Sequence, residues 1–278
     1  MVNATFRGMK AGEQLGNLEY LVDDRVVAEY QALVGNCASY ANLIADDCAS
    51  MTLARFGDIG LTTVWRRFDF LRPPISGRRI QVGGWLKEVR ERAGLPWLRV
   101  SAFAVDEIGT EILRSEAAFA IGVAKVPPEQ VESILRNTPN NGEERSFNGH
   151  VGDSLPLGEW VVPSGQRFRA YEELRCELTG IAKPTDGHGD TQLLAGWLEG
   201  QFSQRLGDDF RWGGRLVLAY RTPATPGVHL VTDAVVMRCD KDHRGTRSVT
   251  LTIDVRNERK KTVAVGEASA NMPSPRLL

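Results

Sequence analysis

The residues best suited to acid–base chemistry lie in a glycine-rich stretch of the second half of the chain. Residues 186–190 read Asp-Gly-His-Gly-Asp, which places the imidazole of His188 between two carboxylates, and Glu177 lies upstream. Histidine changes charge near neutral pH, so His188 with Asp186 or Glu177 would supply an acid and a base. The alternative is that His188 lies in a solvated turn, Asp186 and Asp190 cap a turn or helix, and Glu177 faces water.

An amphipathic helix follows this stretch and would position it. Its apolar residues recur at steps of three or four and are Leu194, Trp197, Leu198, Phe202 and Leu206. The first half has a less regular counterpart in Tyr40, Leu43, Ile44, Met51 and Ala54. Each half is therefore predicted to contain one main helix.

Alternating segments rich in β-branched residues come after each helix and predict strands. They cover residues 61–70, 79–89, 97–106 and 110–122, and then 215–221, 229–240, 246–256 and 261–272. Gly109 and the polar run 257–260 supply hairpin turns. With one short strand before the helix, each half is expected to pack a long helix against an antiparallel sheet.

An internal repeat relates the two halves. Gly12, Leu15, Glu19, Tyr30 and Leu33 return as Gly152, Leu155, Glu159, Tyr171 and Leu174, at an offset of 140 that becomes 141 at the tyrosine. Arg55, Phe56, Gly57, Phe70, Pro73, Gly77 and Ile80 return as Arg205, Leu206, Gly207, Tyr220, Pro223, Gly227 and Leu230, at an offset of 150. The second copy has therefore gained about nine residues between Tyr171 and Arg205.

Composition excludes several classes of function. The chain has 278 residues, with 34 Lys and Arg against 35 Asp and Glu, so no net field draws it to nucleic acid or to an anionic membrane. It shows no signal peptide and no apolar run of spanning length, and its four cysteines are scattered, so we expect a cytoplasmic protein. Four dispersed histidines predict no metal site, and phosphate-loop, dinucleotide and serine-hydrolase motifs are absent from the sequence.

The repeated motifs resemble those of the MaoC-like hydratases and dehydratases. They are Tyr30-x-x-Leu33-x-Gly35 and Tyr171-x-x-Leu174, then Phe70-Leu-Arg-Pro73-x-x-x-Gly77 and Tyr220-Arg-x-Pro223-x-x-Pro226-Gly227, and a final strand with Gly266-Glu-Ala268-Ser-Ala270. The resemblance covers nearly the whole chain. It implies an α+β fold, a tandem double hotdog in which each copy wraps a long helix in an antiparallel sheet. The copies would be residues 1–126 and 150–278, joined by a linker at 127–149.

The resemblance also implies chemistry on an acyl thioester carried by coenzyme A or an acyl carrier protein, with no other cofactor. Family members place an aspartate and a histidine in a loop before the main helix, and a His-Gly pair opens that helix. By the family's spacing Glu177 and Ala182 stand at the aspartate and histidine positions, and Ala195-Gly196 at the helix-opening pair. We therefore expect Gly196 to be the oxyanion donor beside Trp197 in an acyl pocket, with His188 shifted by the insertion.

The first copy keeps less of this machinery. It has Asn36 and Ala41 at the positions of the acid–base pair and Asp46 where the glycine belongs, so we expect it to be a scaffold. A ligand cavity is then predicted along Glu177 to Trp197 in the second copy and not along Asn36 to Asp47. The two copies should pack as a pseudo-dimer with their sheets side by side, leaving an apolar tunnel between the copies.

Three hypotheses of function remain open. The first is a lyase that hydrates enoyl or dehydrates β-hydroxyacyl thioesters, with His188, Glu177 and Asp186 as candidate acid and base and Gly196 as oxyanion donor. The second is a cyclase, isomerase or thioesterase that kept the tunnel but lost the water chemistry. The third is a non-catalytic subunit that pairs with an active hotdog. The expected partners are the thioester, an acyl carrier protein and a second copy of the chain.

Overall fold

The computed structural model describes residues 6–35, 38–45, 47–92, 94–123, 150–181, 188–222, 224–241 and 247–272, with the backbone alone at 188–192, 208, 241, 247 and 272. The first copy contains β1 (Gln14–Leu21), α2 (Asp24–Val34), α3 (Ala41–Ala45), α4 (Asp47–Phe56), β2 (Leu61–Phe70), β3 (Arg79–Arg92), β4 (Leu95–Asp106) and β5 (Glu111–Ile121). The second contains β6 (Ser154–Val161), α6 (Gly165–Thr179), α7 (His188–Leu206), the 3-10 turn η1 (Asp208–Phe210), β7 (Arg215–Tyr220), β8 (His229–Lys241), β9 (Arg247–Asn257) and β10 (Thr262–Met272). The predicted linker at 127–149 lies outside the described residues.

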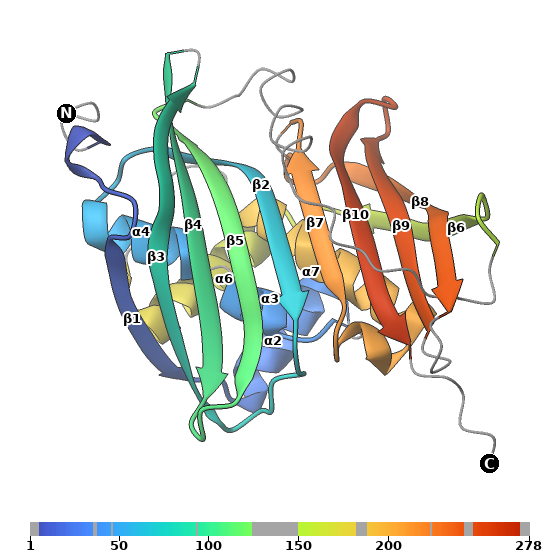
Figure 1. The fold of residues 1–278 in the computed structure, drawn as a ribbon, viewed down its shortest axis with the longest axis horizontal. Coiled ribbons are helices and arrows are strands. Elements are labelled where there is room, and N and C mark those ends of the chain that lie inside the picture. Colours follow the sequence, from blue (N-terminus) through green and yellow to red (C-terminus); the bar gives the residue numbers. More distant parts are fainter. Residues whose placement is uncertain are drawn as a thin grey trace.

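The strands form one antiparallel sheet in the order β1-β3-β4-β5-β2-β7-β10-β9-β8-β6 (Figure 1). At its centre β2 pairs with β7, and Arg67 lies opposite Val217, the residue 150 positions on. Because 150 is the offset of the repeat, each copy meets its own counterpart there, as around a twofold axis. The side-by-side packing of the two sheets is confirmed.

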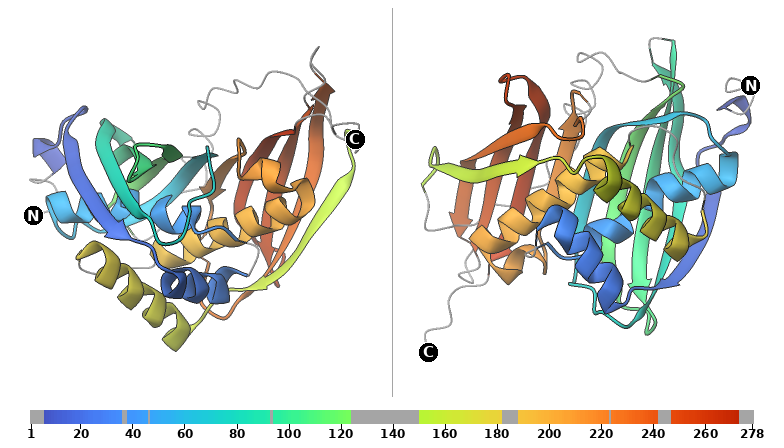
Figure 2. Two further views of the ribbon diagram at one scale, coloured as in Figure 1. Left: turned by 90° about the horizontal axis from the view of Figure 1, so that it is seen from below. Right: turned by 180° about the vertical axis from the view of Figure 1, so that it is seen from behind.

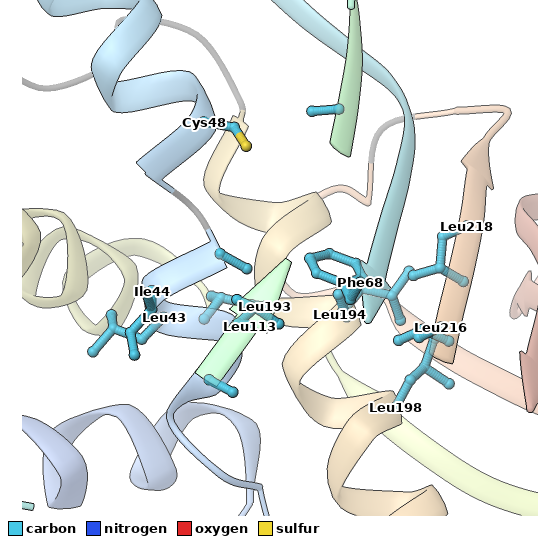
Figure 3. Packing of buried hydrophobic residues seen from close by; sticks show 14 of the residues in the cluster. Leu43, Ile44, Cys48, Phe68, Leu113, Leu193, Leu194, Leu198, Leu216 and Leu218 are labelled. Carbon is cyan, nitrogen blue, oxygen red and sulfur yellow. The ribbon is translucent and has the colours of Figure 1, made fainter. Parts of the chain in front are cut away.

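The helices cover one face of this sheet, and the sheet curves around them (Figure 2). The core is continuous from one copy to the other, because α7 of the second copy packs on α3 and β2 of the first. Figure 3 shows this packing through Leu43, Ile44, Cys48, Phe68, Leu113, Leu193, Leu194, Leu198, Leu216 and Leu218.

Each copy also contains a helix that the sequence analysis did not predict, α2 in the first copy and α6 in the second. The N-cap of α2 is Asp23, whose side chain accepts a hydrogen bond from Val26 N at 2.9 Å. Its buried residues are Val26, Tyr30 and Val34, spaced by four, which is the signal that sequence reasoning passed over.

The extra residues of the second copy lie in its helices and in the connection between them. Helix α6 has 15 residues against 11 in α2, a gain of four. The other five of the nine fall between the end of α6 and the end of α7. The prediction that the gain lies between Tyr171 and Arg205 is confirmed.

Candidate functional site

Helix α7 runs from His188 to Leu206, so His188 is its first residue and Gly189 its second. Gly196 comes eight residues after His188, in the interior of the helix, where a backbone N–H bonds to the carbonyl four residues before it. The prediction that Ala195-Gly196 opens the helix is therefore wrong, and Gly196 has no free N–H to offer an oxyanion. The His-Gly pair at the start of the helix is His188-Gly189, which the inserted residues had concealed in the sequence.

Gly196 instead allows a close contact between the two copies. A Cβ added there would lie 2.0 Å from Tyr30 Oη and 3.3 Å from Val34 Cγ1, both on α2. One turn on, a Cβ at Gly200 would lie 3.0 Å from Ala38 N. The two glycines thus form a small-residue face on α7 against which the α2 region of the first copy packs.

The other predicted site residues are not brought together. Glu177 lies on the exposed side of α6, with its side chain 64% exposed, and accepts a hydrogen bond from Arg25 at 2.9 Å. This is a surface ion pair and not a buried acid or base. Asp186 lies outside the described residues, and of His188 only the backbone is described.

Trp197 is buried, and it stacks on Trp160 of β6 with ring centroids 5.9 Å apart and planes at 15°. Trp160 is the counterpart of Tyr20 at the offset of 140, and Trp197 that of Asp47 at the offset of 150. In the first copy this pair is polar, because the Tyr20 hydroxyl donates a hydrogen bond to Asp47 Oδ2. The same place in the fold therefore holds an aromatic stack in one copy and a phenol–carboxylate pair in the other.

Arg175 of α6 completes the polar pair from the second copy. It donates to Asp47 Oδ1, to Ser50 Oγ at 3.1 Å and to the Leu43 carbonyl at 2.6 Å. The Asp47 side chain is fully buried and that of Arg175 is 8% exposed, so the ion pair lies in the interior between the copies. We call Tyr20, Asp47 and Arg175 the Asp47 cluster.

Helix α3 ends at Ala45, and buried guanidinium groups satisfy carbonyls near its end. Arg66 of β2 donates to the Ala45 carbonyl, as Arg175 does to that of Leu43. These are the groups that a short helix leaves without intrahelical partners. Arg66 is only 1% exposed, so this arginine of β2 makes its hydrogen bond in the protein interior and not at the surface.

Burial controls the electrostatics of the Asp47 cluster. It raises the pKa of Asp47, while Arg175 and the hydrogen bond from Tyr20 oppose the rise. Burial also raises the pKa of Tyr20 well above its usual value, and the Asp47 carboxylate adds to this. The phenol thus stays protonated and remains a hydrogen-bond donor to Asp47.

A second buried carboxylate, Glu199 of α7, also joins the copies. It is fully buried; its Oε2 accepts from Ser39 N of the first copy at 2.7 Å, and its Oε1 from Ser203 Oγ at 3.0 Å. Arg211 Nε lies 3.5 Å from Oε1. Burial raises the pKa of Glu199 from 4.5 to about 7, although Arg211 and the hydrogen bonds partly offset this.

Neither of these buried groups was predicted from the sequence. The repeat itself carried a signal for the first, because aligning the copies puts Asp47 opposite a tryptophan and Tyr20 opposite another. The first copy, which was expected to be a scaffold, contributes Tyr20 and Asp47 to the Asp47 cluster. The sequence pattern did not indicate that Glu199 is buried, since a single charged residue in an amphipathic helix is ordinarily solvated.

Two further properties concern the described part of the chain. Within it, no three or more histidine, cysteine, aspartate or glutamate residues gather where they could hold a metal ion. None of its helices has the length and apolarity needed to cross a bilayer.

Comparison with known proteins identifies the fold. No family model and no curated protein matches the sequence. Among solved structures, a MaoC-like dehydratase is similar over 97% of this chain and 100% of its own, with a TM-score of 0.66 at 16% identity. A Mycobacterium tuberculosis protein described as having a double hotdog fold matches over 96% of this chain and 97% of its own, with a TM-score of 0.65 at 12% identity.

An acyl-ACP thioesterase from Bacteroides thetaiotaomicron is also similar, over 91% of this chain and 96% of its own, with a TM-score of 0.51 at 12% identity. The chain therefore has the double hotdog fold of the MaoC-like dehydratases, as the sequence motifs predicted.

Proposed function

We propose that this chain binds acyl thioesters of coenzyme A or of an acyl carrier protein and adds water to, or removes it from, their α,β-carbons. The observation that carries the proposal is that α7, the main helix of the second copy, begins with His188-Gly189. A His-Gly pair at this helix is what the resemblance to MaoC-like enzymes implies, and the fold is theirs. Fold alone does not assign chemistry, so the proposal depends on these two residues.

In this mechanism the first turn of α7 holds the thioester carbonyl. The leading N–H groups of a helix have no intrahelical acceptor and carry the positive end of its dipole. The Gly189 N–H, with no side chain to obstruct approach, takes the role that the sequence analysis gave to Gly196. It would stabilise the negative charge that develops on the carbonyl oxygen when the α-proton leaves.

His188 would be the base that takes the α-proton during dehydration, and the β-hydroxyl would leave as water after receiving a proton from an acid. Asp186, two residues before His188, is the candidate for that acid. Glu177 is not proposed, because its ion pair with Arg25 places it at the surface.

A thioesterase is the second candidate, favoured by the similarity to an acyl-ACP thioesterase. Both reactions need the same oxyanion donor, but a thioesterase releases a free thiol whereas a dehydratase changes the mass of the acyl group by one water. A non-catalytic subunit would do neither.

The test is to incubate the chain with crotonyl, longer enoyl and β-hydroxyacyl thioesters and to follow both the gain or loss of water and thiol release. His188→Ala should lower the water reaction by about a hundredfold or more, the usual effect of losing a general base. His150→Ala is the matched control, because His150 is exposed just before β6. An unaltered rate in His188→Ala would remove His188 from the mechanism, and thiol release alone would favour the thioesterase.

A further inference from the structure

Asn42 is a buried amide that the described part of the chain does not satisfy. Its side chain lies on α3 and the residue is 2% exposed. Neither Oδ1 nor Nδ2 has a hydrogen-bond partner among the described residues. The other residues of α3 are buried and apolar, namely Ala41, Leu43, Ile44 and Ala45. An amide in such surroundings is unfavourable unless something else meets both of its polar atoms.

Asn42 also lies on a helix that packs against the other copy. Helix α3 packs against α7 of the second copy and against β4 and β5 of the first. Figure 3 shows Leu43 and Ile44 of α3 near Leu193 of α7 and Leu113 of β5. Of the other interior polar groups, Arg175 holds both Asp47 and the carbonyl of Leu43. The buried Tyr40 hydroxyl, two residues before Asn42, likewise has no hydrogen-bond partner among the described residues.

We infer that Asn42 binds a secondary amide of the pantetheine arm that carries the acyl group, an inference that rests on the proposed function. A carboxamide offers an acceptor at Oδ1 and donors at Nδ2. A secondary amide offers the complementary donor and acceptor, and pantetheine contains two such groups. A thioester carbonyl alone would satisfy only Nδ2. The match in hydrogen bonding therefore favours the carrier arm over the acyl group.

The test is Asn42→Leu, which keeps the size of the side chain and removes both polar atoms. If Asn42 awaits a ligand, the variant should fold with an unchanged or higher melting temperature, because replacing an unsatisfied amide by an apolar group of the same shape removes a cost. The variant should bind crotonyl-pantetheine about tenfold or more weakly by calorimetry. Its binding of ethyl thiocrotonate, which has no amide, should be unchanged.

Thr232→Val is the matched control. Thr232 of β8 is 1% exposed, and its hydroxyl likewise has no partner in the described part of the chain. Its counterpart in the first copy, at the offset of 150, is Val82. This variant should also keep or raise the melting temperature, but it should bind crotonyl-pantetheine as the wild type does.

The outcomes separate this inference from the proposed function. Loss of pantetheine binding in Asn42→Leu supports the inference even if the wild type leaves every thioester unchanged, in which case only the proposed function fails. Wild-type turnover with unaltered binding by Asn42→Leu overturns the inference and leaves the function standing. A lowered melting temperature with unaltered binding would show that Asn42 is structural, and a wild type that binds no pantetheine thioester overturns the inference.

Discussion

Tyr20 of β1 and Trp160 of β6 occupy one place in the two copies of the repeat, and Asp47 and Trp197 occupy another. In the second copy the two tryptophans stack, and this contact stabilises the fold beyond what burial of the rings contributes. In the first, the phenol and the carboxylate bond to each other and need Arg175 from the opposite copy. The same sheet and helix arrangement accommodates either the aromatic stack or the polar cluster, because the fold requires only that the space be filled and that buried polar groups be paired.

The difference extends to the helices that cross between the copies. Helix α2 of the first copy approaches α7 at Gly196, which lies against Tyr30. On α4 of the first copy the contact is made by Arg175, which reaches Ser50 and Asp47. One interface thus depends on close packing and the other on a buried ion pair, and the two should respond differently to substitution.

The largest expected effect comes from breaking the polar interface. Arg175→Met leaves the buried carboxylate of Asp47 without its cation and should lower the free energy of unfolding by about 3–5 kcal/mol, measured by urea denaturation. The double variant Asp47→Leu, Arg175→Met should lose less than Arg175→Met alone, because neither charge then remains buried and unpaired. A double variant as unstable as the single one would contradict the account of the Asp47 cluster.

Glu199 should give a pH-dependent effect with the opposite sign. Because its folded pKa of about 7 lies above the usual 4.5, the ionised form destabilises the fold. Stability is then full below about pH 4.5, falls as pH rises toward 7, and stays low above that. At pH 8 the free energy of unfolding of Glu199→Gln, measured by urea denaturation, should therefore exceed that of the wild type by up to about 3 kcal/mol. At pH 5 the two proteins should differ little. Equal stability of the two proteins at pH 8 would argue against the raised pKa.

The close-packed interface is tested by Gly196→Ala. Alanine normally favours a helix interior over glycine by about 1 kcal/mol. Here the added methyl group would overlap Tyr30 Oη, so we expect a net loss of about 1–3 kcal/mol. Tyr30→Phe removes that oxygen and should restore part of the loss, whereas Gly200→Ala should cost less, since its nearest neighbour is 3.0 Å away. A gain in stability from Gly196→Ala would show that the helices do not approach this closely.

The smallest effect is expected at the surface pair between the copies. Glu177→Gln removes an exposed partner of Arg25 and should leave both the melting temperature and any turnover of thioesters unchanged. A marked loss of turnover with intact folding would return Glu177 to the catalytic role that the sequence analysis gave it.

The sequence by itself determined the repeat, nearly every strand and the main helix of the second copy, whereas the one helix predicted over Tyr40 to Ala54 in the first copy is divided between α3 and α4. Strand alternation and helical periodicity are local properties, and the offset of 150 already marked the residues that face each other between β2 and β7. It also supplied His188-Gly189, although the nine inserted residues hid where α7 begins. Helices α2 and α6 could also have been predicted, since the buried residues of α2 recur every four residues and those of α6 lie three and four residues after Tyr171.

Only the tertiary structure decided which groups meet between the copies. Asp47 and Arg175 lie 128 residues apart, and Ser39 and Glu199 lie 160 apart, so no spacing in the sequence pairs them. Gly196 was assigned to a helix opening by counting, whereas its role follows from the approach of Tyr30. The physical reason is that the role of a charged residue or a glycine depends on the groups that pack against it. Packing across a pseudo-twofold axis brings together segments that are far apart in the sequence.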